Sequence, residues 1–190
     1  HHDGSDVWVA LDASFFDDPG AEASNLIVQM QDITARRSAE ARLQHIAFHD
    51  SLTGLPNRSR FHEHLAQAIA AANGDPERRF AVMFLDFDRF KLVNDSMGHS
   101  AGDAFLVQVA RRIREHVRPR DVVARLGGDE FAVLCEDLER EAHAVTLAER
   151  LQLVLGEPLQ IGGTEITTSA SIGITFSTFG YTLPEEVLRD

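Results

Sequence analysis

Apolar residues follow two spacings along this chain, and each spacing predicts a different kind of secondary structure. Short, nearly continuous apolar runs predict β-strands, which here cover 80–85, 122–124, 131–135 and part of 166–176. Apolar residues three or four positions apart predict helices, which here cover about 57–74, 102–117 and 140–155. The alternation of helices and strands predicts an α+β fold, in which a mixed central sheet is flanked by helices.

The first part of the chain has a pattern of its own. Two strand-like segments, 6–11 and 25–30, enclose the turn-forming sequence Asp17-Asp18-Pro19-Gly20 and predict a β-hairpin. A two-stranded hairpin has too little apolar surface to be stable alone. Two interpretations are open: a hairpin packed on the main domain, or the end of an upstream domain.

A helix-forming, charged segment begins near Thr34. Ala39, Leu43 and Ile46 recur in it at spacings of four and three, as on a narrow coiled-coil seam. The segment holds only about two heptads, which is too short for a coiled coil without neighbours. We therefore expect a connecting helix that also pairs with a partner chain.

Charge and composition narrow the functional classes. The 190 residues carry a formal net charge of −12, which argues against a nucleic-acid partner because such proteins are usually basic. No apolar run approaches the roughly 18 residues of a membrane span, so we expect no membrane contact within this chain. Cys135 is the only cysteine, and it is expected in the core. This usage is consistent with the cytoplasm, although a longer protein could be anchored elsewhere.

Two glycines stand directly against two carboxylates in Gly127-Gly128-Asp129-Glu130. Because apolar runs flank this sequence, it predicts a β-hairpin whose turn needs positive φ. Glycine also removes the side chains that would keep phosphates away from the backbone. Two carboxylates on a tight turn are unfavourable unless a cation or proton joins them. The turn therefore predicts a site for a metal and a phosphate.

A second pair of acids, Asp86 and Asp88, follows the buried strand at 80–85. Residues two apart on a strand share a face, and Mg²⁺ prefers one or two carboxylates with phosphate oxygens. Taken alone, the pair is better interpreted as exposed acids at a strand end. With the acidic turn also present, we expect Asp86 and Asp129 to converge on one ion.

Asn94 and Asp103 flank a glycine-containing segment that could bind a base. An amide and a carboxylate together can recognise the edge of guanine, with the acid accepting from the ring N–H and the amino group. The alternative is that both residues cap helices. Lys91 is placed to stabilise phosphate charge, and its alternative is a solvated surface lysine.

Arginines are concentrated between Arg111 and Arg125 in an otherwise acidic chain. Most of them suit the solvated side of a helix. Arg118 and Asp121 differ, because they lie at the expected helix exit, where Pro119 fixes the backbone. An arginine fork there can bind a phosphate or a guanine edge, and the acid can accept from guanine N–H groups.

Asp50–Phe176 resembles a GGDEF domain, the diguanylate cyclase family. The resemblance rests on ordered motifs, which are Asp50-Ser51-Leu52-Thr53-Gly54-Leu55-Pro56-Asn57-Arg58, Asp86-Phe87-Asp88-Arg89-Phe90-Lys91, Asn94-Asp95, Gly98-His99, Gly102-Asp103, Gly127-Gly128-Asp129-Glu130-Phe131 and Ser171-Ile172-Gly173. Residues 1–34 resemble the final strands of a PAS sensor domain over a shorter stretch.

The resemblance implies a role for each matching residue. The implied ligands of Mg²⁺, or Mn²⁺, are Asp86, the Phe87 carbonyl and Asp129. The implied contacts with GTP are Asn94, His99, Asp103, Gly127 and Gly128, with Asn94 and Asp103 on the guanine. Lys91 would stabilise the transition state, and Asp129 or Glu130 would help to deprotonate the 3′-hydroxyl. Arg118 and Asp121 fit the Arg-x-x-Asp motif through which cyclic di-GMP inhibits its own synthesis.

The implied reaction joins two GTP molecules into cyclic di-GMP and releases two pyrophosphates, and it requires a homodimer because each domain offers one half-site. The implied organisation is the end of a PAS domain at 1–34, a linker helix at 35–50 and a GGDEF domain at 51–190. This GGDEF domain lacks the family's C-terminal helix with its phosphate-binding cations, which implies a piece of a longer protein. The alternative is a non-catalytic GTP-binding module that controls a downstream cyclic di-GMP phosphodiesterase domain.

Overall fold

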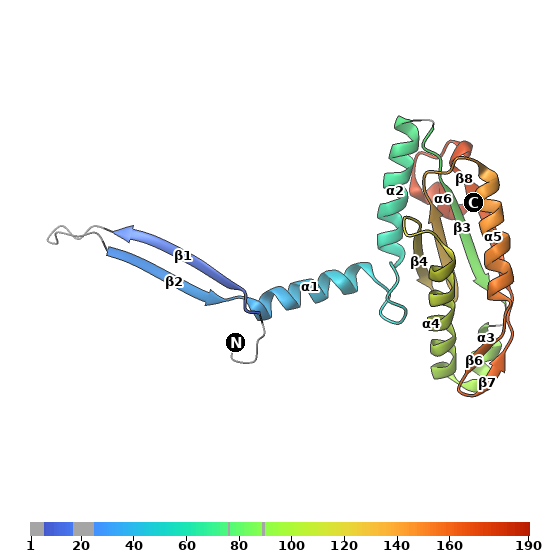
Figure 1. Ribbon diagram of the computed structural model, residues 1–190, viewed down its shortest axis with the longest axis horizontal. Coiled ribbons are helices and arrows are strands. Elements are labelled where there is room, and N and C mark those ends of the chain that lie inside the picture. The colour runs from blue at the N-terminus through green and yellow to red at the C-terminus, as the bar shows by residue number, and fades with distance from the viewer. Residues whose placement is uncertain (1–5, 17–24, 76, 89) are drawn as a thin grey trace. The chain divides into compact units, whose positions relative to one another are not determined.

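The computed structural model describes residues 6–16, 25–75, 77–88 and 90–190. Its residue contacts divide the chain into two compact units, His1–Ala47 and Phe48–Asp190 (Figure 1). The expected turn at 17–20 lies outside the described residues. Within the described ranges, no helix combines the length and the apolar character that crossing a membrane requires.

The N-terminal unit holds the predicted hairpin and most of the predicted helix. Strands β1 (Val9–Phe16) and β2 (Asn25–Asp32) pair antiparallel, and α1 (Thr34–Phe48) follows. Trp8 joins the hairpin to the helix, because its N–H donates to Thr34 Oγ1 at 2.9 Å and the Arg37 guanidinium lies 4.0 Å from its ring centroid. On α1, Leu43 and Ile46 of the expected seam are each 66% exposed.

The C-terminal unit is built on a four-stranded sheet in the order β4-β5-β3-β8. Its strands are β3 (Ala81–Phe87), β4 (Val122–Gly127), β5 (Glu130–Cys135) and β8 (Ala170–Phe176). Every neighbouring pair in this sheet is antiparallel. The α+β fold is therefore confirmed, but the expectation of a mixed sheet was wrong. Helices connect β3 to β4 and β5 to β8, and the two strands of each pair do run parallel. They are not neighbours, however, because β5 lies between β3 and β4, and β3 lies between β5 and β8.

Among the described residues, five helices belong entirely to this unit. They are α2 (Arg58–Gly74), α3 (Phe90–Met97), α4 (His99–His116), α5 (Glu141–Leu155) and α6 (Pro184–Arg189). The sequence pattern did not predict α3, which is separated from α4 by Gly98 at a φ of 83°. A short hairpin, β6 (Leu159–Ile161) and β7 (Thr164–Ile166), and the 3₁₀ turn η1 (Ser177–Phe179) complete the unit.

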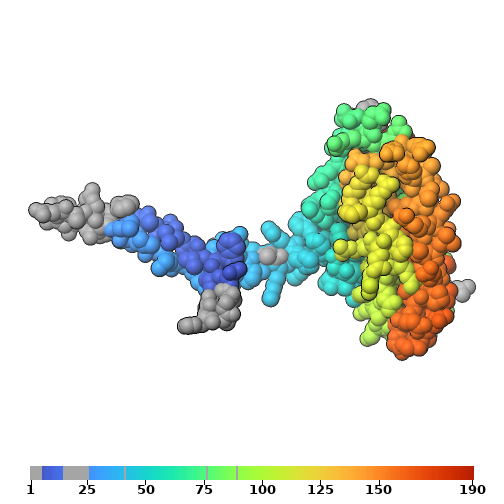
Figure 2. Space-filling view, in the orientation of Figure 1, coloured from blue at the N-terminus to red at the C-terminus, as the bar shows by residue number. Residues whose placement is uncertain are grey.

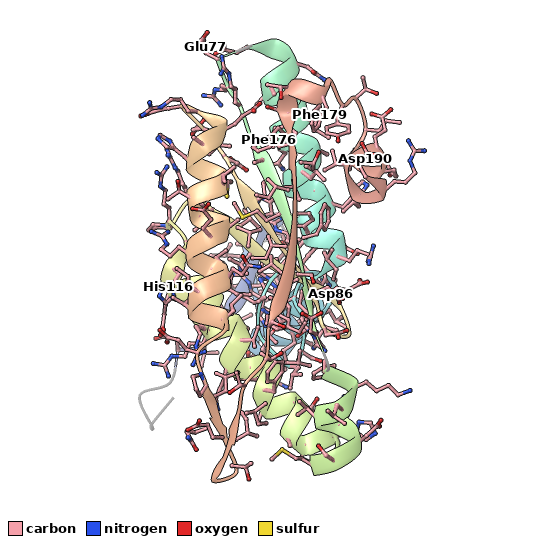
Figure 3. All side chains as sticks on the ribbon, turned by 90° about the vertical axis from the view of Figure 1, so that its right-hand side faces the viewer. Glu77, Asp86, His116, Phe176, Phe179 and Asp190 are labelled. Atoms are coloured by element: carbon pink, nitrogen blue, oxygen red, sulfur yellow. The ribbon has the colours of Figure 1, made fainter. Side chains whose placement is uncertain are left out.

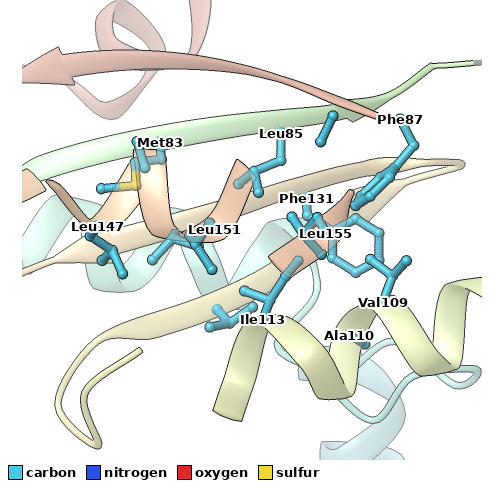
Figure 4. Close-up of a cluster of buried hydrophobic side chains, with 14 of the residues drawn as sticks. Met83, Leu85, Phe87, Val109, Ala110, Ile113, Phe131, Leu147, Leu151 and Leu155 are labelled. Atoms are coloured by element: carbon cyan, nitrogen blue, oxygen red, sulfur yellow. The ribbon is translucent and has the colours of Figure 1, made fainter. Parts of the chain in front are cut away.

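Alternating side chains of the strands build two separate cores. In Figure 3, the orange helix α5 and the teal helix α2 lie on opposite sides of the sheet. One face of the sheet packs against α4 and α5, and its buried residues include Met83, Leu85 and Phe131 (Figure 4). The other face, with Val82 and Ala132, packs against α2 and α6. Helices α4 and α5 also form much of the face of this unit that is visible in Figure 2.

An aromatic cluster fixes the ends of β3 and β5. The ring of Phe87 makes edge contacts with Phe105 of α4 at 5.6 Å and with Phe131 of β5 at 5.8 Å between centroids. Such pairs are favoured beyond the area that they bury. Because Phe87 follows Asp86 and Phe131 follows Glu130, the cluster holds in place the backbone that carries both acids.

Candidate active site

The turn between β4 and β5 has the predicted backbone conformation. Gly127 pairs with Glu130, and the φ angles of Gly127 and Gly128 are 149° and 53°. Residues other than glycine rarely adopt these values. A β-carbon on either glycine would meet no atom within 4 Å, so the space above the turn is open and a ligand can approach the backbone.

Arg125 fastens this turn to a distant loop. Its Nε and Nη2 donate to the Gly128 carbonyl at 2.9 and 2.8 Å. Its Nη1 donates to Asp50 Oδ1 and Oδ2 at 3.0 and 3.1 Å. The two side chains are only 12% and 22% exposed. No role was predicted for Arg125 from the sequence, although a charged residue that interrupts an apolar strand was a signal.

Asp50 is fixed in turn by the loop that it begins. Its Oδ1 accepts from the Thr53 N–H at 2.9 Å and from the Thr53 hydroxyl at 2.7 Å. Partial burial alone raises the pKa of the Asp50 carboxyl, but the bonds from Thr53 and the charge and bonds of Arg125 outweigh it and lower the pKa. The loop ends at Asn57, which caps α2 as predicted by accepting from the Arg60 N–H at 3.0 Å.

Two acids and one arginine line a cleft of about 470 Å³ beside the turn. Asp86 comes from β3 and Glu130 from the adjacent β5, next to the paired residues Leu85 and Phe131. Arg58, the first residue of α2, donates from Nη2 to Glu130 Oε2 at 3.4 Å and from Nε to the Leu126 carbonyl at 3.3 Å. Asp86, labelled in Figure 3, lies near the end of β3, an interior strand between β5 and β8. This contact of Arg58 was not predicted from the sequence.

The structure distributes the other acids differently from the expectation. Asp129 is half-buried in the turn and does not line the cleft of Asp86 and Glu130. Asp88 is engaged elsewhere, because its Oδ2 accepts from the Ser169 hydroxyl at 2.6 Å. The expected convergence of Asp86 and Asp129 therefore stays a prediction.

The donor set of this region fits a hard divalent cation. Carboxylate and carbonyl oxygens are what Mg²⁺ and Mn²⁺ bind, and Mg²⁺ commonly takes only one or two carboxylates beside substrate phosphates. No group of three or more acidic, histidine or cysteine side chains is gathered for metal binding within the described ranges. A cation here would thus depend on oxygens from a ligand as well as from the protein.

The expected base-binding residues lie on the paired helices α3 and α4. Asn94 lies inside α3 and is partly buried, and Asp103 lies inside α4 and is exposed. Neither one caps a helix, so the capping alternative was wrong; the residue before α4 is Gly98. Lys91 and His99 are exposed on the same two helices.

Arg118 and Asp121 form a tight turn after α4. The Arg118 N–H donates to Asp121 Oδ2 at 2.9 Å, and the Asp121 N–H donates to the Arg118 carbonyl at 3.0 Å. Burial raises the pKa of the Asp121 carboxyl, and the opposing influence of Arg118 does not cancel this effect. Both side chains line a cavity of about 420 Å³, together with Cys135 and Arg150.

Arg150 could not be assigned to this cavity from the sequence. It comes from α5, and its Nη2 donates to the His116 carbonyl at 2.6 Å. That bond joins α5 to the end of α4, beside the Arg118 turn. Only the packing of α5 against α4 brings Arg150 to Arg118, and no local sequence pattern indicates it.

Residues 47–190 match the family described as "Diguanylate cyclase, GGDEF domain". This chain belongs to the GGDEF family. The signature Gly127-Gly128-Asp129-Glu130-Phe131 forms the open turn and the start of β5. The resemblance seen in the sequence is thereby confirmed for the GGDEF part, and the PAS resemblance of residues 1–34 stays a prediction.

Relatives and solved structures agree with this membership. The bifunctional diguanylate cyclase/cyclic di-GMP phosphodiesterase MucR of Pseudomonas aeruginosa is 51% identical over 74% of this chain. The diguanylate cyclase TpbB of the same organism is 42% identical over 90% of it. A structure of the TpbB GGDEF domain has a TM-score of 0.71 at 45% identity, over 75% of this chain and 83% of that one.

A third neighbour contains a ligand. The coiled coil and GGDEF domain of DgcB from Caulobacter crescentus, in complex with c-di-GMP, has a TM-score of 0.74 at 26% identity, over 83% of both chains. This GGDEF chain spans only 20% of the length of MucR and 40% of the length of TpbB.

Proposed function

We propose that this chain contains the catalytic domain of a diguanylate cyclase, which condenses two molecules of GTP into cyclic di-GMP. The 3′-oxygen of each GTP attacks the α-phosphorus of the other. Each attack forms one P–O bond, breaks the bond to the β-phosphate and releases one pyrophosphate. The observation that carries the proposal is the open Gly127-Gly128 turn beside a cleft with two acids, because phosphates can approach bare backbone there.

Named residues supply the steps around this reaction. Asn94 and Asp103 recognise the guanine, His99 contacts the nucleotide, and Lys91 stabilises phosphate charge in the transition state. Asp129, or Glu130 beside it, accepts the proton of the 3′-hydroxyl.

Asp86, the Phe87 carbonyl and Asp129 would hold Mg²⁺ or Mn²⁺, which neutralises phosphate charge when bound. The anchoring of Phe87 by Phe105 and Phe131 supports this assignment, because it fixes the carbonyl and the neighbouring carboxylate together.

We also infer that catalysis requires two copies of the chain. One domain offers one half-site, so two GTP molecules meet only when two turns face each other. The exposed Leu43 and Ile46 of α1 support pairing of the linker helix. In this scheme residues 1–34 end a PAS sensor domain, 35–50 form the linker, and the sensor controls how the two half-sites are oriented.

The decisive experiment is direct. The full-length protein is freed of bound nucleotide, incubated with GTP and Mg²⁺, and its products are separated by chromatography. We expect cyclic di-GMP and pyrophosphate from the wild type and from Glu139→Ala, an exposed control outside the site. Asp129→Ala should abolish synthesis. A protein that forms no cyclic di-GMP is not a cyclase, and an Asp129→Ala variant of normal rate disproves the role of Asp129.

Product inhibition is proposed at the cavity of Arg118 and Asp121. A guanidinium and a carboxylate that line one cavity can bind a phosphate and a guanine edge together. Arg118→Ala should weaken inhibition by added cyclic di-GMP about tenfold or more, because a charge-assisted bond is lost. Arg120→Ala is the matched control, since Arg120 faces Asp137 at 3.9 Å instead. Equal sensitivity of both variants would count against this site.

A second candidate function is regulatory, and the MucR name, which joins cyclase and phosphodiesterase activities in one protein, supports only the downstream phosphodiesterase domain that it requires. The domain would then bind GTP without turning it over and control a downstream phosphodiesterase domain. In that case GTP alters cyclic di-GMP hydrolysis by the full-length protein, while the incubation with GTP yields no cyclic di-GMP. The two outcomes separate the two proposals.

A further inference from the structure

Asn94 and Gly102 lie closer together than any side chain at position 102 would allow. Asn94 belongs to α3, and Gly102 to the beginning of α4. A β-carbon built on Gly102 would lie 2.0 Å from Asn94 Oδ1 and 2.9 Å from Asn94 Cγ. Both distances are shorter than real contacts of a β-carbon. The Asn94 carboxamide therefore occupies the space that a side chain at position 102 would need.

The backbone around Gly98 holds the two residues in this contact. The Gly98 N–H donates to the Asn94 carbonyl at 2.9 Å, and the Gly102 N–H donates to the Gly98 carbonyl at 3.3 Å. These bonds close the turn between α3 and α4. Among the described residues, no hydrogen bond joins the Asn94 carboxamide to another protein group. Its donor and acceptor groups thus remain available to a ligand.

We propose that Gly102 is a specificity-determining residue, because the space that it leaves sets where Asn94 meets the guanine of GTP. The inference rests on the proposed function, in which Asn94 and Asp103 recognise the base. Asp103 follows Gly102 directly and points to an exposed position on α4. Gly102 is thus next to one base-binding residue, Asp103, in the sequence and limits the position of the other, Asn94, in space.

Position 102 requires space and not an unusual backbone. Gly102 lies in a helix at an ordinary negative φ, and alanine is the better helix former there. The atom that a new methyl group would meet is the end of a flexible side chain, which can rotate to another rotamer. Gly102→Ala should therefore leave the fold intact and displace the Asn94 carboxamide.

The test compares Gly102→Ala, Asn94→Ala, the double variant and the control Gly74→Ala in the full chain. Gly74 ends α2, and a β-carbon there would meet no atom within 4 Å. Binding of GTP, ITP and ATP is measured by competition with a fluorescent GTP derivative, and thermal unfolding is measured alongside. ITP and ATP differ from GTP only at the base edge, so their relative affinities report on base recognition.

We expect Gly102→Ala to lower the preference for GTP by about fivefold or more, which is the effect of losing one or two hydrogen bonds. The competitor nucleotide against which the preference falls should be the same one as for Asn94→Ala, and the melting temperature should not fall. The double variant should prefer GTP as strongly as Asn94→Ala alone. Gly74→Ala should keep the full preference.

Two outcomes overturn the inference while the proposed function stands. One is a Gly102→Ala variant that keeps its preference when Asn94→Ala loses it. The other is a loss of folding in Gly102→Ala that the double variant does not repair, because removal of the carboxamide removes the clash. An Asn94→Ala variant with unchanged preference instead refutes the guanine assignment, and the inference with it.

Discussion

Arg125 and Asp50, 75 positions apart in the sequence, form an ion pair in which Arg125 Nη1 lies 3.0 and 3.1 Å from the two carboxylate oxygens of Asp50. The same guanidinium binds the Gly128 carbonyl through its other two nitrogens. One side chain therefore connects the loop after α1 with the signature turn. The loop and the turn thus share one partly buried, hydrogen-bonded guanidinium.

Removal of this link should destabilise the domain. Arg125→Ala leaves Asp50 without its cation and the Gly128 carbonyl without its donors, so we expect a loss of about 2–3 kcal/mol in the free energy of unfolding. Arg125→Lys should recover part of the loss, because lysine keeps the charge but cannot form the fork. Urea denaturation at neutral pH measures both.

The control for this experiment is Arg111→Ala. Arg111 also pairs with an acid, Glu115, at 2.8 Å, but its side chain is 79% exposed. Exposed pairs of this kind contribute little to stability, because solvent screens the two charges. If Arg125→Ala costs no more than Arg111→Ala, the ion pair with Asp50 does not stabilise the turn.

Asp50 should give the stability a specific pH dependence. Its pKa is lower in the folded state than the ordinary value of 3.8. The unfolded chain therefore binds the proton first, and the stabilisation by Asp50 is fully present above about pH 4 and is lost as the pH falls through the folded-state pKa. Asn at this position does not titrate. The stability difference between wild type and Asp50→Asn should thus shrink below pH 4.

Urea denaturation of both proteins between pH 7 and pH 3 measures this difference. The contributions of the other acids of this chain cancel in the difference between wild type and Asp50→Asn, because these acids titrate in both proteins. A difference that is as large at pH 3 as at pH 7 would contradict the lowered pKa.

The secondary structure was predictable largely because burial leaves a period in the sequence. The strand at 80–85 and the helix before Gly74 were recognised from their apolar spacing, and both are buried as expected. Helix α3 was missed because a single buried residue, Val93, leaves no such period in it. Whether neighbouring strands pair parallel or antiparallel depends on the spatial order of the strands in the sheet. No local sequence pattern encodes that order.

The site was predictable where chemistry is local. The glycines and acids of the turn stand side by side in the sequence, and so the turn was found. Three arginine contacts form only when the chain folds. Arg58 reaches Glu130 across 72 positions of sequence, and Arg150 reaches the Arg118 turn across more than 30. The third contact, from Arg125 to Gly128, is local in sequence. For Asn94, the partner that limits its position is a glycine, whose importance lies in an absent side chain.

Asp86 and Asp88 should respond differently to substitution, although they are two residues apart. Asp86 lines the cleft with Glu130, whereas Asp88 accepts a bond from Ser169 at 2.6 Å. We expect Asp86→Asn to abolish the enhancement of GTP binding by Mg²⁺, since a cation gains little from a neutral amide. Asp88→Asn should preserve that enhancement. Calorimetric titration of GTP with and without Mg²⁺ measures it, and equal losses in both variants would refute the assignment of Asp86.

Cys135 should be inert toward alkylation until the domain unfolds. It ends β5 at the wall of the Arg118 cavity, but its side chain is only 2% exposed. Burial raises the pKa of its thiol to about 12, so at pH 8 only about one thiol in ten thousand is ionised, and the thiolate is the reactive form.

Iodoacetamide should therefore label the native protein at least about a hundredfold more slowly than the protein in denaturant. Mass spectrometry follows the labelling, and intermediate urea should raise its rate only in proportion to the unfolded fraction. Rapid labelling of the folded protein would mean that the cavity admits the reagent to Cys135, in which case a ligand in the cavity should protect the thiol.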